Sequence, residues 1–361
     1  MRRNRLAILL HDLASGGTEL VALRLARAWR EQGRQVDLIC GSSSGSLKSL
    51  VDPGVNLIVP PQPIERGRGS RFLLGRAAAE ICRHRGIGGL FIPGSSHFPA
   101  LEGFAEKRRG EAPFIICKLS SVLRRDDRPL LLRWRALRSK AKLLSKADAV
   151  VALSPALANE ANQLLGPLPL SIIEDPIFAR EDGRPPHATD PRNGLIAAGR
   201  LAPAKDFGLA VEALACSKDR GLTLTILGEG PDRAALERQV ERAGLTGRVT
   251  LPGNVPDIKP WLQSGRAFIL SSRYEGYPAV AVEALSQGTP VIATNCTPAM
   301  REIITNPARG EVVGTRRAHD LARAVDRVLL RPLPALTDTE ELWHRHQIDG
   351  AADHYLQLFD S

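Results

Sequence analysis

The stretch from Leu6 to Cys40 reads LAILLHDLASGGTELVALRLARAWREQGRQVDLIC and decides the first half of the fold. Leu6 to Leu10 is a short apolar run of the kind that forms a buried strand, and His11 to Gly17 is rich in turn-forming residues. From Thr18 to Arg30 the apolar residues recur with a helical period. Strand character returns from Gln35 to Cys40, which completes a β-α-β unit and predicts a parallel sheet.

The same order of elements begins again in the second half. Gly194–Ala198 is predicted as a strand, Gly199–Asp206 as a loop, Phe207–Ala215 as a helix and Thr223–Leu227 as the next strand. Two such halves predict an α/β protein with two Rossmann-like domains facing a central cleft. Ligands are then expected at the carboxyl ends of the strands. The length of 361 residues agrees with two domains.

Short apolar runs predict further buried strands, and one polar stretch marks a boundary. These strands are Gly89–Ile92, Phe114–Cys117, Ala149–Leu153, Val249–Leu251, Ala267–Leu270 and Pro290–Ala293. Between Glu181 and Gly194 the chain is rich in proline, glycine and polar residues, which is typical of a linker. The N-terminal domain is therefore placed at residues 1–185 and the C-terminal domain at residues 186–344.

Composition excludes several classes of protein. Hydrophobic residues make up 43% and charged residues 24%, so a largely disordered chain is excluded. No apolar run approaches the length of a membrane-spanning helix, and the run after Met1 is too short for a signal peptide. The five cysteines are scattered, without metal-ligand spacing, and are expected to be reduced thiols. We expect a cytoplasmic protein.

The basic charge is concentrated in the first half. Residues 1–180 hold 28 Lys or Arg against 16 Asp or Glu, and the densest part runs from Lys118 to Lys146. Within it an apolar stripe at helical spacing includes Leu130, Trp134 and Leu137. Three explanations stay open: the solvated face of a core-packed helix, a surface for an anionic membrane or acceptor, and nucleic-acid binding. The last is disfavoured because only 16 residues are aromatic and no binding motif accompanies them.

The strongest chemical signal is the run from Ser271 to Leu285. Glu275 follows a predicted strand and precedes Gly276, which lets the backbone approach a ligand closely. Pro278 lies where a helix begins, and Glu283 falls in the second turn of that helix. A helix N-terminus between two carboxylates suits an anion and the hydroxyl pairs of a sugar or ribose.

A second group supplies positive charge. Arg200 and Lys205 lie in the loop after the first strand of the second domain. A guanidinium and an ammonium at this place fit a diphosphate leaving group. The pair Gly16 and Gly17 offers a further close backbone approach in the first half.

These motifs together resemble a known family. The segments GRLAPAK (199–205), LGEGP (227–231) and SSRYEGYPAVAVEALSQGTPVIAT (271–294) are similar to those of the retaining nucleotide-sugar glycosyltransferases of family 4, which have the GT-B fold. The similarity extends to Ser15–Glu19 and to Ala147–Ser154. It implies that residues from about 345 to 361 form a helix that crosses back onto the N-terminal domain, and that this domain binds the acceptor.

The resemblance also implies roles for the site residues. Arg200 and Lys205 would neutralise the nucleotide diphosphate, Glu275 would bind hydroxyls of the donor sugar, and Glu283 would bind the ribose. Further donor contacts are implied for Gly16, Gly17, Val255, Gly276, Tyr277, Pro278 and Ala279.

Two departures from the family pattern concern the acceptor side. The segment Ile115–Ser121 lacks the histidine that the family often has there, and His97 is the candidate for a polar catalytic role in its place. The family's frequent Asn-Pro before the linker is Asp175-Pro176 in this chain. Both departures leave the donor motifs intact.

The predicted reaction needs no metal, because the chain contains no Asp-x-Asp sequence to hold one on the diphosphate. The expected enzyme transfers a hexose or N-acetylhexosamine, with UDP favoured over GDP, to a lipid-linked or polysaccharide acceptor. No cofactor and no nucleic-acid partner are expected, whereas peripheral contact with an anionic membrane is. The alternatives are a sugar-nucleotide epimerase or phosphorylase of the same fold, and a non-catalytic adaptor at a membrane surface.

Overall fold

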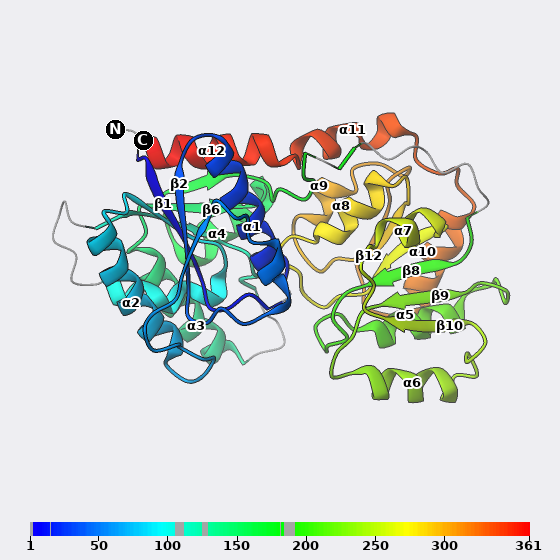
Figure 1. The fold of residues 1–361 in the computed structure, drawn as a ribbon. Coiled ribbons are helices and arrows are strands. Elements are labelled where there is room, and N and C mark those ends of the chain that lie inside the picture. Colours follow the sequence, from blue (N-terminus) through cyan, green and yellow to red (C-terminus); the bar gives the residue numbers. More distant parts are fainter. Residues whose placement is uncertain (1–2, 15, 105–111, 125–128, 181, 184–191) are drawn as a thin grey trace. The chain divides into compact units, whose positions relative to one another are not determined.

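The computed structural model of the chain describes residues 3–14, 16–104, 112–124, 129–180, 182–183 and 192–361. The chain divides into two compact units (Figure 1). Unit 1 consists of Met1–Arg180 together with His346–Ser361, and unit 2 consists of Glu181–Arg345. Most of the predicted linker falls on residues outside the described ranges.

The described part of unit 1 contains a seven-stranded parallel sheet in the order β3-β2-β1-β4-β5-β6-β7. Its strands are β1 (Arg5–Leu10), β2 (Gln35–Cys40), β3 (Asn56–Ile58), β4 (Gly89–Ile92), β5 (Phe114–Lys118), β6 (Ala149–Ala152) and β7 (Leu170–Ile172). The strand β1 is apolar on both sides because each of its faces is covered. Leu6, Ile8 and Leu10 belong to one buried cluster, and Ala7 and Leu9 belong to another.

Helices cover both faces of this sheet. They are α1 (Gly17–Glu31), α2 (Ser70–Arg85), α3 (Leu130–Leu144), α4 (Pro155–Leu165), α12 (Ile348–Asp360) and the 3-10 helices η1 (Ser46–Leu50) and η2 (Ser95–Phe104). Figure 1 shows α12, in red, lying along unit 1 beside α1. Trp29 of α1 makes edge-to-face contacts with Tyr355 and Phe359 of α12, with ring centroids 5.9 and 5.6 Å apart. These aromatic contacts fix the end of the chain on unit 1.

Unit 2 repeats the architecture. Its described sheet is parallel and six-stranded, in the order β10-β9-β8-β11-β12-β13. The strands are β8 (Leu195–Ala198), β9 (Leu224–Leu227), β10 (Val249–Gly253), β11 (Ala267–Leu270), β12 (Val291–Thr294) and β13 (Gly310–Val313). The helices are α5 (Phe207–Cys216), α6 (Arg233–Arg242), α7 (Lys259–Ser264), α8 (Ala279–Ser286), α9 (Met300–Ile303), α10 (Ala318–Leu329) and α11 (Leu336–Arg345).

Both sheets confirm the predicted α/β class with two Rossmann-like units. Every strand expected from the sequence is present, with its ends shifted by two residues at most. Three strands were not predicted: β3, β7 and β13. Each of the three lies at an edge of its sheet.

The strand order reverses once in each sheet, between β1 and β4 in unit 1 and between β8 and β11 in unit 2. At such a point the loops that follow the two strands leave in opposite directions and open a crevice at their carboxyl ends. These two places are where a ligand is expected in each unit.

Candidate functional site

In unit 2 the loops after β8 and β11 are joined at the reversal of strand order. The amide N–H of Arg273 donates to the carbonyl oxygen of Ala204 over 2.7 Å, and the Ser271 hydroxyl donates to the carbonyl oxygen of Lys205 over 3.1 Å. Two loops that are about 70 residues apart in the chain therefore form one surface.

Lys205 and Glu275 meet on this surface. The Lys205 ammonium donates to Oε1 of Glu275 over 2.6 Å, and the Ser272 hydroxyl donates to the same oxygen over 2.6 Å. The Lys205 side chain is 25% exposed and that of Glu275 is 12% exposed. Both charges are therefore held in place, close together and still open to a ligand.

A clamp made by Asp206, Arg273 and Arg316 holds the same two loops. The Arg316 guanidinium donates to the carbonyl oxygens of Ser272 and Ser271 over 2.7 and 3.1 Å, and it also binds the Asp206 carboxylate. Arg273 pairs with that carboxylate over 2.9 Å. Asp206 has a φ of +48°, and it is the only non-glycine residue among those described with a positive φ. This clamp was not predicted from the sequence.

The glycines of the LGEGP segment bring two loops into backbone contact. A Cβ atom at Gly228, where φ is +128°, would lie 2.1 Å from the carbonyl oxygen of Gly199. A Cβ atom at Gly230 would lie 2.2 Å from the carbonyl oxygen of Leu201. These glycines are therefore needed for the loop after β9 to pack against the loop that carries Arg200 and Lys205.

The helix α8 begins beside the Lys205–Glu275 pair. Pro278 is its N-cap residue, and Glu283 lies in its second turn, as predicted. The preceding loop is anchored to the one after β12, because the Glu275 amide donates to the Cys296 carbonyl oxygen and the Thr297 hydroxyl donates to that of Gly276. The amide of Ala279 already donates to the carbonyl oxygen of Tyr277 over 3.0 Å.

The remaining donor-side candidates lie on other loops of unit 2. Arg200 is exposed, and it forms no ion pair with any residue that the structure describes. Val255 is half-buried in the loop after β10. The roles implied for these two residues stay predictions, as do those of Gly276, Tyr277 and Glu283.

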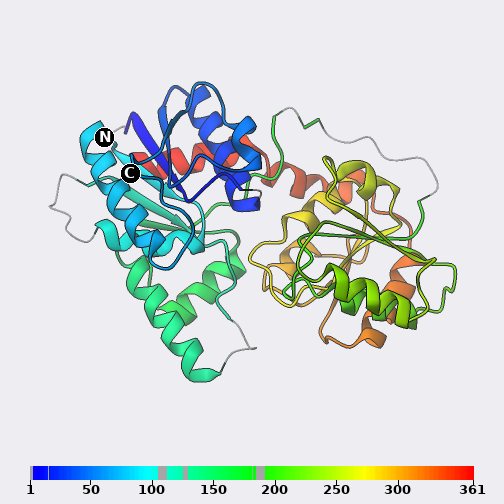
Figure 2. The same cartoon turned by 60° about the horizontal axis from the view of Figure 1, so that its bottom comes forward.

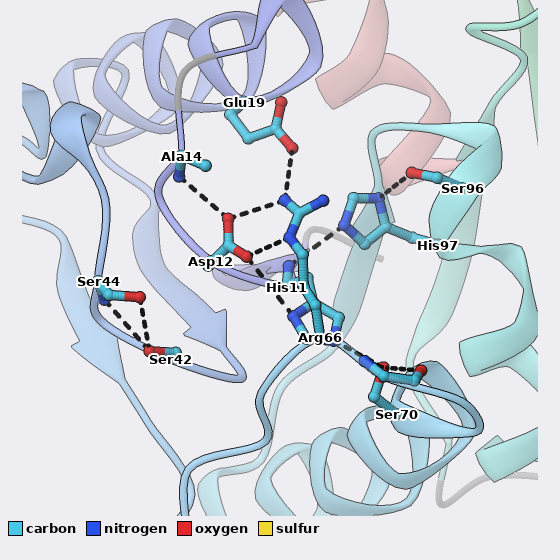
Figure 3. Close-up of polar contacts among 11 residues, drawn as sticks. His11, Asp12, Ala14, Glu19, Ser42, Ser44, Arg66, Ser70, Ser96 and His97 are labelled. Carbon is cyan, nitrogen blue, oxygen red and sulfur yellow. Dashed lines mark hydrogen bonds and ion pairs between the residues drawn. The ribbon is translucent and has the colours of Figure 1, made fainter. Parts of the chain in front are cut away.

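Unit 1 has its own polar cluster at the reversal of strand order (Figure 3). The His97 side chain is 2% exposed, and its Nε2 accepts a hydrogen bond of 3.2 Å from the backbone N–H of His11. Burial lowers the pKa of His97 to about 4, so the ring is neutral near pH 7. With Nε2 an acceptor, Nδ1 carries the proton and faces the Ser96 hydroxyl 3.3 Å away. His97 is thus a fixed neutral group, and its proposed catalytic role stays a prediction.

His11 leaves one buried ring nitrogen open. Its Nε2 lies 3.0 Å from the Ser70 hydroxyl, which in turn donates to the carbonyl oxygen of Gly67. Its Nδ1 is buried and has no hydrogen-bond partner among the described residues, and it lies 3.8 Å from Oδ2 of Asp12. Burial lowers the pKa of His11, so this nitrogen is an acceptor without a donor.

Arg66 connects two carboxylates in the same cluster. Its guanidinium binds both oxygens of Asp12, in one case over 2.8 Å, and lies 4.0 Å from Glu19. The hydrogen bonds from Arg66 lower the pKa of Asp12, whereas burial raises the pKa of Glu19. A Cβ atom at Gly16 would lie 2.3 Å from the Glu19 carboxylate, so glycine leaves the space for it.

The segment without the family's histidine carries a buried lysine. Lys118, at the end of β5, is 1% exposed, and its ammonium donates to Oδ1 of Asp175 over 2.6 Å. The two departures noted in the sequence are therefore physically coupled: the residue that replaces the asparagine is the counter-ion of this lysine.

Gly16 and Gly17 lie at the start of α1. Gly16 is the N-cap residue, and Gly17 is exposed with open space where a Cβ atom would stand. The prediction that both residues cap the donor from the opposite domain stays a prediction.

Neither a metal-binding cluster nor a membrane-spanning helix occurs among the residues that the structure describes. No group of three or more His, Cys, Asp or Glu gathers there in a way that could hold a metal ion. None of the described helices is long and apolar enough to cross a bilayer. Metal independence stays a prediction.

Each half of the chain matches a known family of glycosyltransferases. Residues 180–342 match the family described as glycosyl transferases group 1, and residues 15–177 match the family described as Glycosyltransferase Family 4. The lipopolysaccharide core biosynthesis glycosyltransferase LpsE of Rhizobium meliloti (strain 1021) is 30% identical over 171 residues, which are 46% of this chain and 49% of LpsE. The amylovoran biosynthesis glycosyltransferase AmsD of Erwinia amylovora is 29% identical over 130 residues, which are 36% of this chain and 34% of AmsD. The chain thus spans half or less of the length of these two relatives.

Solved structures agree in fold. HepE of Anabaena in complex with UDP-glucose has a TM-score of 0.80 at 17% sequence identity, with 99% of each chain covered. At this identity the likeness shows the arrangement of strands and helices and nothing further about the site.

Proposed function

Because the chain belongs to glycosyltransferase family 4, we propose that it is a retaining, metal-independent glycosyltransferase of cell-surface glycan biosynthesis. It moves a hexose or an N-acetylhexosamine from a UDP-linked donor to a lipid-linked or polysaccharide acceptor. The observation that carries this proposal is the Lys205–Glu275 pair, held beside the start of α8 at the carboxyl ends of β8 and β11.

The chemistry assigned to unit 2 is departure of the nucleoside diphosphate. Lys205 and the N-terminus of α8 stabilise the charge that develops on the leaving phosphate, and the exposed Arg200 closes on it when the donor binds. The free edge of the Glu275 carboxylate accepts hydrogen bonds from hydroxyls of the sugar. Glu283 binds the ribose hydroxyls, and the loop at Val255 lies by the base.

The acceptor is assigned to unit 1. Its hydroxyl attacks the anomeric carbon from the face that the diphosphate leaves, so the new C–O bond forms as the old one breaks and the configuration is kept. The hydroxyl proton passes to the departing phosphate oxygen. In this proposed step His97 is not the base, because its Nε2 already accepts the N–H of His11 and burial lowers its pKa to about 4. We assign His97 to positioning the backbone at His11.

The proposal includes a place of action in the cell. The acceptor is presented at the inner face of the cell membrane, and the basic unit 1 makes peripheral contact with that surface. LpsE and AmsD are named for biosynthesis of lipopolysaccharide core and of amylovoran, and both names support an acceptor that belongs to a surface glycan.

The experiment that tests the function is product analysis with a labelled UDP-sugar. Transfer of label to a lipid-linked acceptor supports the proposal. An isomerised nucleotide sugar or a sugar phosphate would instead identify an epimerase or a phosphorylase. Donor binding without turnover would identify an adaptor. Lys205→Ala and Arg200→Ala are each expected to slow transfer at least about a hundredfold, and near-normal turnover would reject the assigned roles.

The same protein can be screened for its donor by thermal shift. UDP and UDP-sugars are expected to raise the melting temperature, and GDP and GDP-mannose to leave it unchanged. A shift with GDP alone would overturn the choice of base and keep the reaction class.

A further inference from the structure

The N-terminal end of α3 (Leu130–Trp134) exposes an unusual run of large apolar side chains. Exposure is 78% for Leu130, 65% for Leu131, 54% for Leu132 and 53% for Trp134. We call these four residues the apolar tip. They make up nearly half of the exposed large apolar residues among those described. Exposed large apolar side chains gathered at one end of a helix are typical of an interaction site.

The apolar tip differs from the part of α3 that packs on the sheet. Leu144 is fully buried, and Leu137 and Leu143 pack against the buried cluster on one face of the unit 1 sheet. The stripe expected from the sequence is therefore only half correct: Leu137 faces the interior, whereas Leu130 and Trp134 face solvent. In Figure 2, α3 lies at the lower edge of unit 1, outside the sheet.

Basic side chains continue the exposed face of α3. Successive residues of an α-helix are turned by about 100° around its axis. Four exposed residues after Leu131 lie on the same side of α3 as Leu131, within a sector of about 100°. They are Trp134, Arg135, Arg138 and Lys142. We call Arg135, Arg138 and Lys142 the basic row. The Arg138 guanidinium stacks over the Trp134 ring, 4.6 Å from its centroid, so the apolar and basic parts adjoin.

The sequence places no counter-charge on this helix. Residues 129–147 contain six Lys or Arg and no Asp or Glu. A helix that combines exposed Leu and Trp with a row of Lys and Arg has the properties of an interfacial helix: apolar side chains enter the acyl region while basic ones contact anionic headgroups.

We propose that α3 is the membrane-docking element of this protein, with its apolar tip inserted into an anionic phospholipid surface and its basic row on the headgroups. This inference rests on the proposed function in one respect, since that function needs a lipid-linked acceptor at a membrane. A second copy of the chain is a poorer occupant, because it would bring the same row of positive charges against the first.

The test is co-sedimentation of the purified full-length protein with vesicles. Vesicles of phosphatidylcholine alone are compared with vesicles that also contain phosphatidylglycerol. Wild type is expected to bind the anionic vesicles, to bind the neutral ones about a hundredfold less, and to lose binding in high salt.

Two sets of variants separate the apolar tip from the basic row. Leu131→Ser with Trp134→Ser is expected to weaken binding at least about tenfold, because inserted apolar area is lost without a change of charge. Replacing the basic row by Gln is expected to weaken binding about a hundredfold, since each basic residue near an anionic surface contributes about a factor of five. The matched controls are Leu330→Ser, at a site 88% exposed in unit 2, and the triple change of Arg220, Arg238 and Arg242 to Gln.

Vesicle binding tests the membrane-docking role of α3 separately from glycosyl transfer. Selective loss of vesicle binding in the α3 variants, with the UDP-induced thermal shift unchanged, supports the proposal. Equal binding by α3 and control variants overturns it, as does equal binding to neutral and anionic vesicles. Self-association that disappears in the variant with both Leu131→Ser and Trp134→Ser, without vesicle binding by wild type, would assign the face to a second copy. Absence of any thermal shift with UDP, GDP and their sugars in wild type would reject the proposed function and leave the vesicle result standing.

Discussion

The Lys205–Glu275 pair allows a charge needed for structure to be separated from a charge needed for transfer. The perturbation is a cycle of three variants: Lys205→Met, Glu275→Gln and the double change. Both substitutions keep most of the side-chain volume and remove the charge. The single Lys205→Met change leaves the Glu275 carboxylate, 12% exposed, with the Ser272 hydroxyl as its remaining described donor.

The magnitudes follow from the burial of the pair. Losing the partner of a fully buried ion costs about 3–5 kcal/mol, and the partial exposure of Lys205 together with the retained Ser272 hydrogen bond reduces this to about 2 kcal/mol. For a unit of this size we expect the melting temperature to fall by about 4–8 °C. Removing both charges returns stability to within about 1 kcal/mol of wild type, because no unpaired buried ion is left.

Transfer is expected to respond differently. Lys205→Met lowers kcat at least about a hundredfold, equivalent to about 2.7 kcal/mol of transition-state stabilisation, and the double variant stays as slow. The assays are chemical denaturation for stability and UDP release with a saturating acceptor for kcat. The control is Lys146→Met, because the Lys146 side chain is 24% exposed and pairs with Glu102 over 3.4 Å. We expect it to keep normal transfer. Recovery of transfer in the double variant to near the wild-type rate would refute the assignment and leave the pair a structural contact.

The other predictions concern pH, the clamp and the thiols. His97 is expected to make the protein less stable as pH falls. Its pKa is about 4 in the folded protein and about 6.5 in the unfolded chain, so between these pH values only the unfolded chain binds a proton at this residue. Between pH 7 and pH 5 the free energy of unfolding is expected to fall by about 2 kcal/mol more in wild type than in a His97→Gln variant. An equal fall in the two proteins, measured by chemical denaturation at both pH values, would contradict this. Arg316→Ala is expected to lower kcat about tenfold with little change in KM for the donor, since it frees two carbonyl oxygens of the loop before Glu275, and Arg316→Lys recovers part of the loss. A change in KM alone would place Arg316 in donor binding instead. In the native protein only Cys216 is expected to react rapidly with a thiol reagent, because it is exposed, whereas burial raises the pKa of Cys40, Cys82 and Cys296 to about 12. Two or more fast thiols would contradict the burial.

The central strands could be predicted because burial on both faces leaves a clear signal. Strands such as β4 and β11 are apolar at every position and completely buried, so a short apolar run is enough to find them. The missed strands β3 and β7 have three residues each and are half-buried. A strand at the edge of a sheet has fewer neighbours, so its composition is less constrained and resembles that of a loop.

The candidate site was predictable where its residues are contiguous. The run from Glu275 to Glu283 places a glycine, an N-cap proline and two carboxylates on one loop and one helix, and the structure has them so. Arg200 and Lys205 were found because they follow a central strand. The contact between Lys205 and Glu275 was not deducible from spacing, because it depends on β8 lying beside β11.

Three charged residues that the sequence did not single out as site residues lie beyond edge strands. Arg66 lies beyond β3, and Arg316 lies beyond β13. Asp175, noticed only as a departure from a motif, lies beyond β7. Each of the three side chains pairs with a charged residue of a more central element: Asp12 just after β1, Lys118 at the end of β5, and Asp206 at the start of α5. When an edge strand is not predicted, the position of the loop after it is not predicted either. The ion-pair partners in these loops could therefore not be placed from the sequence. The loops after the central strands thus carry most of the candidate site residues, and the loops after the edge strands supply ion-pair partners for charged residues of the central loops.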